Sequence, residues 1–129
     1  MRFARIVFTA AGLWGLVVLT PLYFMLDRIG QSYPPPITHP DFYYSFLAIT
    51  LAWQIGFLII GRDPVRLRPM MIPAVLEKAF YILTLAVLYG QGRLEPGQLA
   101  PGLPDFLLGC LFVAAFFKTR QRTAATYSA

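Results

Sequence analysis

Three polar side chains recur on one face of an otherwise apolar segment. Glu77, Tyr81 and Thr84 are separated by four and then three residues, a spacing that puts them on one side of a helix. A carboxylate at membrane depth is costly and commonly takes part in ligand binding or proton transfer. The stripe therefore predicts a site in which an acid, a phenol and a hydroxyl contact the polar end of a ligand.

The preceding apolar segment carries a second polar pair, Gln54 and, one turn further from the loop, Thr50. Because a short loop joins the two segments, Gln54 and Glu77 are expected at nearly equal depth, as hydrogen-bond partners. Beyond Thr50 this face becomes apolar, which is typical of an amphipathic pocket. The alternative is a Gln54–Glu77 hydrogen bond that only fixes helix packing. Lys78 lies about 100° around the helix from Glu77 and is expected to snorkel toward the cytoplasmic rim.

The segments that position these residues are four apolar runs, at about residues 6–26, 42–60, 70–89 and 104–118. At 1.5 Å per residue, each of the first three is long enough to cross roughly 30 Å of hydrocarbon. The composition is 57% hydrophobic and the mean hydropathy is +0.60. We therefore expect residues 1–129 to form a single all-α domain, an integral membrane four-helix bundle with up-down-up-down topology.

The basic residues indicate the orientation of this bundle. Eight flank the cytoplasmic ends of the predicted helices: Arg2, Arg5, Arg62, Arg66, Arg68, Lys118, Arg120 and Arg122. Only Arg28 and Arg93 fall in the two other loops. The positive-inside rule places both termini and the 61–69 loop in the cytoplasm, with a bacterial inner membrane as the expected location. The net charge of +5 then reflects topology and gives no reason to propose nucleic-acid binding.

Several local features refine the first half of the chain. Thr20 and Pro21 predict a kink in the first helix, since proline removes a backbone hydrogen bond. Ala11, Gly12 and Gly15 form a patch of small residues that another helix can approach closely. A loop with four prolines, at residues 31–41, is expected to be a stiff strap over the outer end of the bundle.

Reactive groups are sparse, which excludes several classes of function. The single cysteine, Cys110, cannot form an intrachain disulfide, and one histidine cannot supply the ligand pair of a bundle haem. His39, with Asp27 and Asp41 nearby in sequence, is either a metal or pH-sensitive group or a capping and loop-docking residue, and we favour the second interpretation. No metal, cofactor or catalytic residue is therefore predicted. The sequence does not decide whether the protein is an enzyme, but it favours a protein that is not one.

Three short stretches, Phe24–Asp27, Trp53–Gln54 and Arg68–Glu77, resemble the EXPERA superfamily, four-helix membrane proteins related to sterol isomerases and the sigma-2 receptor. In that family, an acid after the first helix and polar residues in the second and third line a pocket for a sterol-like or amine ligand. The resemblance implies this role for Asp27, Gln54 and Glu77. Gln54 is not an acid, however, and Glu77 stands where a histidine is expected, so the likeness implies a hydrophobic-ligand site more than catalysis.

The favoured hypothesis is a membrane protein that binds a lipid or other hydrophobic ligand inside the bundle. The predicted ligand-binding residues are Glu77, Gln54, Thr50, Tyr81, Thr84, Trp53 and Asp27. The alternative is a non-catalytic structural or assembly subunit that contacts other membrane proteins through the small-residue patch and the strap. A small proton-coupled transporter ranks third, because families of that kind carry their glutamate in the first helix. Membrane lipids are the expected partners, and other membrane subunits are possible ones.

Overall fold

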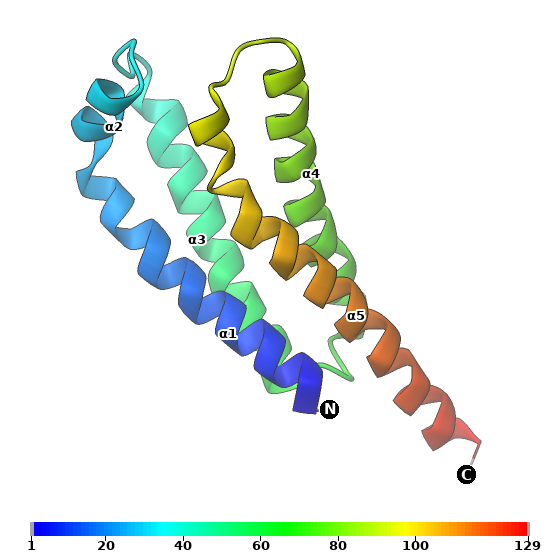
Figure 1. The fold of residues 1–129 in the computed structure, drawn as a ribbon. Helices are drawn as coiled ribbons and strands as arrows, with labels where there is room; N and C mark the ends of the chain where they lie inside the picture. The colour runs from blue at the N-terminus through cyan, green and yellow to red at the C-terminus, as the bar shows by residue number, and fades with distance from the viewer. Residues whose placement is uncertain (1, 129) are drawn as a thin grey trace.

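The computed structural model describes residues 2–128, and for residues 121–126 it describes the backbone only. Throughout this part of the chain the regular structure is helical (Figure 1). The helices are α1 (Arg2–Leu19), η1 (Thr20–Phe24), α2 (Leu26–Ser32), α3 (Pro40–Arg62), η2 (Arg68–Met70), α4 (Met71–Gly90), η3 (Pro96–Leu99) and α5 (Gly102–Tyr127).

Four of these segments are long and apolar enough to cross a membrane. They are Arg2–Phe24, Pro40–Arg62, Arg68–Gly90 and Pro96–Arg120, each of 23 or 25 residues with a mean hydropathy of 1.7 or 1.8. The apolar runs in the sequence thus predicted the number and order of the long helices. Large apolar side chains are exposed along all four, as expected of helices that meet hydrocarbon.

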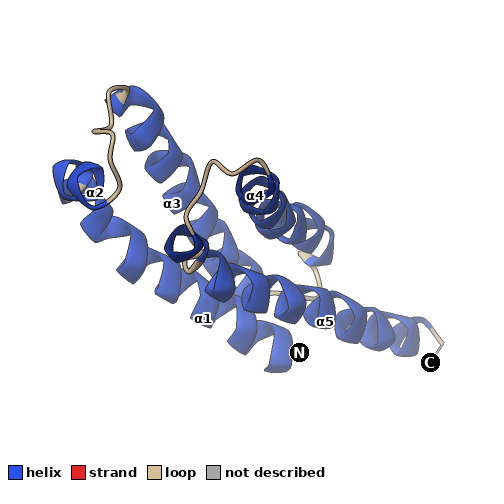
Figure 2. Cartoon of the chain, turned by 45° about the horizontal axis from the view of Figure 1, so that its top comes forward, coloured by secondary structure: helices blue, strands red, loops and turns tan. Residues whose placement is uncertain are grey.

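The helices pack as two pairs joined through a shared aromatic core. α1 runs along α3, α4 runs along α5, and α5 also packs against α1 (Figures 1 and 2). In the core, the ring of Phe8 stacks on that of Phe112 with centroids 4.3 Å apart, and Phe57 meets Phe112 edge-on at 5.0 Å. These three rings come from α1, α5 and α3, so the core ties the two pairs together.

The sequence predicted that the short 61–69 loop would make α3 and α4 packing neighbours, and this is wrong for most of their length. The two helices make few contacts and diverge away from the loop (Figure 1). The physical reason lies in α5, whose Phe112 and Ala115 occupy the core beside Phe57 and Ala74. α4 packs on α5, and α3 packs on α1.

The predicted patch of small residues explains the close packing of α1 on α3. A Cβ atom added to Gly12 would lie 2.7 Å from the side chain of Leu58 and 2.8 Å from the carbonyl oxygen of Gln54. A Cβ on Gly15 would overlap the Gln54 side chain. The expectation that another helix approaches this patch is confirmed, and the helix that does so is α3 of the same chain.

The helix boundaries differ from the prediction in three places. α1 begins at Arg2, before the apolar run, and gives way to the η1 turn at Thr20, where the sequence predicted a kink. A short helix that the sequence did not predict, α2 (Leu26–Ser32), lies between the first apolar run and the proline strap. α5 continues to Tyr127, well past residue 118, because no proline or glycine follows Gly109 to end it.

Candidate functional site

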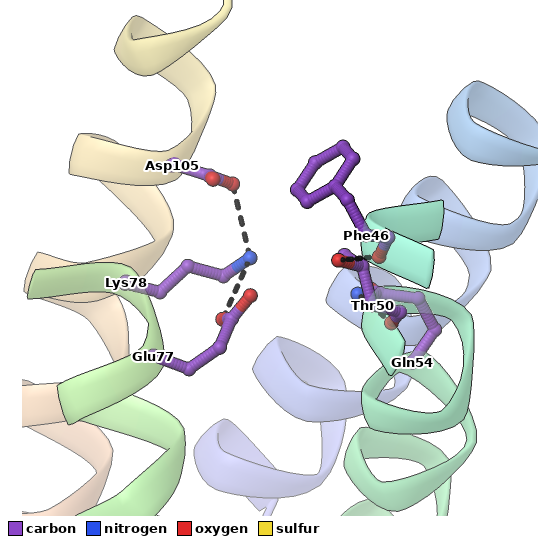
Figure 3. Close-up of polar contacts among 6 residues, drawn as sticks. All are labelled: Phe46, Thr50, Gln54, Glu77, Lys78 and Asp105. Atoms are coloured by element: carbon purple, nitrogen blue, oxygen red, sulfur yellow. Dashed lines mark hydrogen bonds and ion pairs between the residues drawn. The ribbon is translucent and has the colours of Figure 1, made fainter. Parts of the chain in front are cut away.

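Two charged residues of α4, Glu77 and Lys78, and one at the start of α5, Asp105, form a cluster that we call the ion cluster. The Nζ atom of Lys78 lies 3.2 Å from Oε2 of Glu77 and donates a hydrogen bond to Oδ1 of Asp105 at 3.0 Å (Figure 3). Lys78 is only 4% exposed, and its ammonium also lies 5.3 Å from the centre of the Phe57 ring. Three helices, α3, α4 and α5, therefore surround one buried positive charge.

The start of α5 explains why Asp105 reaches this position. Asp105 occupies the first turn of α5, where a carboxylate interacts favourably with the positive end of the helix. α5 begins beside Leu85, since a Cβ on Gly102 would lie 2.8 Å from Cδ1 of that residue. One turn beyond Asp105, a Cβ on Gly109 would lie 3.3 Å from Cβ of Lys78, so α4 and α5 are close at this level.

The predicted snorkelling of Lys78 toward the cytoplasmic rim is wrong. A buried ammonium is tolerated where carboxylates and hydrogen bonds surround it, and the two acids and the Phe57 ring supply this environment. Sequence reasoning missed both Lys78 and Asp105 as members of the site. A count of charges in the apolar runs could have identified them. Three ionisable residues, of both signs, fall within or at the start of the last two apolar runs and could have been expected to pair with one another.

The predicted hydrogen bond between Gln54 and Glu77 is not formed. Nε2 of Gln54 donates to the carbonyl oxygen of Thr50 at 3.0 Å, and the rest of the side chain packs against Gly15 of α1. Gln54 is 2% exposed and belongs to the α1–α3 contact, whereas Glu77 belongs to the α4–α5 pair. Oε2 of Glu77 is buried without a hydrogen-bond partner, although the Lys78 charge is close to it.

Thr50 and Trp53 lie on the face of α3 that leads outward from Phe57. Phe46, Thr50, Trp53 and Phe57 follow each other at spacings of four, three and four residues, which places them in one stripe. The Trp53 ring lies 6.1 Å from that of Phe57, and Trp53 lines a surface hollow of about 260 Å³ with Ile49 and Ala52. This stripe is thus continuous with the ion cluster through the Phe57 ring.

On α4, Tyr81 and Thr84 follow Glu77 on the same helix face, as predicted. The Thr84 hydroxyl donates to the carbonyl oxygen of Phe80 at 2.8 Å, just as that of Thr50 donates to Phe46 at 2.6 Å. Both hydroxyls therefore satisfy their hydrogen bonds within their own helices. Figure 3 shows Glu77 and Lys78 extending from α4 toward the side on which Phe46 and Thr50 lie.

Asp27 lies far from this region, in the first turn of α2. It lines a hollow of about 300 Å³ with Leu26, Gly30, Gln31 and residues of the proline strap. His39 meets the Phe42 ring edge-on at 5.8 Å. In the part of the chain that the structure describes, no group of three His, Cys, Asp or Glu side chains is arranged to hold a metal ion.

Comparison with known proteins adds no relative to this picture. No protein-family model, no curated protein sequence and no solved structure matches the chain.

Proposed function

We propose that the chain is an integral membrane protein with up-down-up-down topology and both termini in the cytoplasm. Some of the basic residues that predicted this orientation, Arg5, Arg62 and Lys118, lie at one end of the helices. Nη2 of Arg5 approaches the carbonyl oxygen of Arg62 at 3.5 Å, and the ammonium of Lys118 lies 4.0 Å from the centre of the Phe3 ring. A positive-inside bias and a spatially clustered positive end both support a cytoplasmic location for this end.

In this membrane setting, we propose that the protein binds a lipid or another hydrophobic molecule along the outer parts of α3 and α4. We call this surface the ligand face: Phe46, Thr50 and Trp53 of α3, with Glu77, Tyr81 and Thr84 of α4. The observation that carries the proposal is the divergence of α3 and α4 outward from the Phe57–Lys78 contact. Because of this divergence, the stripe of side chains on α3 and the stripe on α4 do not pack against each other.

The ligand face differs from the pocket predicted by the sequence. Gln54 is buried where α3 packs on α1, so it is not part of the ligand face. Glu77 is the polar anchor in the proposal. Its side chain is 19% exposed, whereas that of Lys78 is 5% exposed and is already held by two carboxylates. The Glu77 carboxylate accepts a hydrogen bond from the polar end of the ligand, and the aromatic stripe of α3 covers the apolar body.

The experiment is a comparison of co-purifying ligand by native mass spectrometry of protein extracted in a mild detergent. Trp53→Ala and Glu77→Gln are each expected to lower ligand retention, because one removes apolar contact and the other removes charge from the anchor. The matched control is Ile55→Ala, since Ile55 is also on α3, is 53% exposed and faces away from Phe57. Equal retention by Trp53→Ala and Ile55→Ala would contradict the proposal.

The alternative, a structural or assembly subunit, has less support from the geometry. One of its two predicted contact surfaces, the small-residue patch with Gly12 and Gly15, is covered by α3 of the same chain. The proline strap then remains as the contact surface for this alternative. Gentle solubilisation followed by identification of bound subunits distinguishes the two functions, because ligand binding requires no second protein.

A further inference from the structure

The cytoplasmic end of the proposed bundle is rich in basic residues, which we call the inner collar: Arg2, Arg5, Arg62, Arg66, Arg68, Lys118 and Arg120. The side chain of Arg122 lies outside the described part. The loop between α3 and α4 contributes one acid, Asp63, and its carboxylate accepts a hydrogen bond from the backbone N–H of Arg66 at 3.2 Å. The collar therefore has a large excess of positive charge at one level of the molecule.

Arg68 is the fixed member of the inner collar. Its Nε donates to the carbonyl oxygen of Phe116 at 3.2 Å, and its guanidinium carbon lies 3.8 Å from the centre of the Phe116 ring. These contacts hold the guanidinium plane between α4 and α5. They leave the terminal Nη groups without a hydrogen-bond partner among residues 2–120. A guanidinium held in this way loses little side-chain entropy when it binds a second group, and its paired donors match the oxygens of a phosphate.

Apolar side chains are exposed beside Arg68. Met70 of η2 is 46% exposed and Ile72 of α4 is 52% exposed, and Phe117 of α5 is 55% exposed next to the ring on which Arg68 stacks. A free phosphate ion would gain nothing from contact with exposed apolar side chains. An ordered cation next to exposed apolar side chains matches a molecule that has a negative headgroup attached to hydrocarbon chains.

We propose that the inner collar is a binding site for anionic phospholipids, with the headgroup phosphate on Arg68 and the acyl chains along the adjoining surface of α4 and α5. The site rests on the membrane placement proposed above. It does not depend on the ligand face, which lies toward the opposite end of α3 and α4. Failure of one site therefore leaves the other to be judged separately.

The test uses the full chain in detergent, titrated with phosphatidylglycerol or phosphatidylcholine and observed by native mass spectrometry. The protein is expected to retain phosphatidylglycerol in preference to phosphatidylcholine. Arg68→Gln should lower that preference about fivefold, the contribution of one basic residue near an anionic lipid surface. Arg68→Lys keeps the charge but loses the planar fork, so it should show an intermediate preference. Arg66→Gln, at an exposed position, supplies a second variant should Arg68→Gln fail to fold.

The matched control is Arg93→Gln, which removes an exposed arginine from the loop at the other end of the molecule and should leave the lipid preference unchanged. Soluble glycerol phosphate, added in excess, should not displace the lipid, because it lacks the acyl chains. Equal loss in Arg68→Gln and Arg93→Gln would overturn the proposal. Equal retention of the two lipids, or displacement by glycerol phosphate, would do so as well.

Discussion

Replacing Lys78 with methionine is the most direct test of the ion cluster. Methionine keeps most of the side-chain length and its apolar contact with Phe57 but removes the ammonium. The carboxylates of Glu77 and Asp105 each approach this one nitrogen, at 3.2 and 3.0 Å, so their oxygens are at most about 6 Å apart. Without Lys78, two partly buried acids face each other with no positive charge between them.

The structure sets the size of the expected effect. Breaking a buried ion pair by removing one partner costs about 3–5 kcal/mol, because the remaining charge stays desolvated. We expect Lys78→Met to lower the free energy of unfolding by an amount in this range. Lys118→Met is the control, since Lys118 is exposed and its contact with the Phe3 ring contributes about 0.5–1 kcal/mol.

A compensating variant separates charge from packing. Combining Lys78→Met with Glu77→Gln and Asp105→Asn removes all three charges while it keeps the side-chain volumes nearly constant. Much of the lost stability should return, because neutral amides cost less to bury than unpaired carboxylates. The measurement is reversible unfolding in mixed micelles, followed by circular dichroism as the fraction of denaturing detergent rises. The argument fails if Lys78→Met and Lys118→Met differ by less than about 1 kcal/mol, or if the triple variant is no more stable than Lys78→Met.

Two further predictions concern packing and membrane placement. Gly12→Ala should destabilise the fold by about 1–3 kcal/mol, because the new methyl group meets the Gln54 carbonyl oxygen at 2.8 Å. Gly56→Ala, whose Cβ has nothing closer than 3.8 Å, should be neutral or stabilising by up to about 1 kcal/mol in the same unfolding assay, and the reverse order would refute the α1–α3 contact. Cys110 is exposed and lies within the fourth apolar segment, so in intact membranes it should resist a charged maleimide and react with it once the chain is unfolded in denaturing detergent. Rapid labelling by the charged reagent, measured by mass shift, would contradict burial in hydrocarbon.

The long helices were predictable from the sequence because the signal is local. A run of about 20 apolar residues identifies a potential span without any knowledge of its neighbours. The close approach at Gly12 and Gly15 was also predictable, since small residues on one helix face permit contact whatever the partner is. The short helix α2 was missed, because seven residues with Asp27, Arg28 and Gly30 among them carry no clear apolar period.

The partners of the polar residues were not predictable in the same way. The pairing of Gln54 with Glu77 assumed that the shortest loop joins the most closely packed helices. In the structure, the partner of α4 is set by where α5 begins, beside Leu85, and hence by how residues 91–101 return from the end of α4. That path depends on the η3 turn and the glycines around it, and small changes there would move Asp105 out of register with Lys78.

The placement of α4 gives two adjacent charged residues different roles. Side chains at consecutive helix positions leave the helix about 100° apart, so Glu77 and Lys78 have different surroundings although their charged ends meet at 3.2 Å. α4 is covered by α5 on one side and diverges from α3 on another. Lys78 is consequently buried with Asp105 and Phe57, while Glu77 borders the ligand face. The Lys78 ammonium lies 3.2 Å from Oε2 of Glu77 and holds this carboxylate from the buried side, and under the proposed function the same carboxylate is the anchor for the ligand.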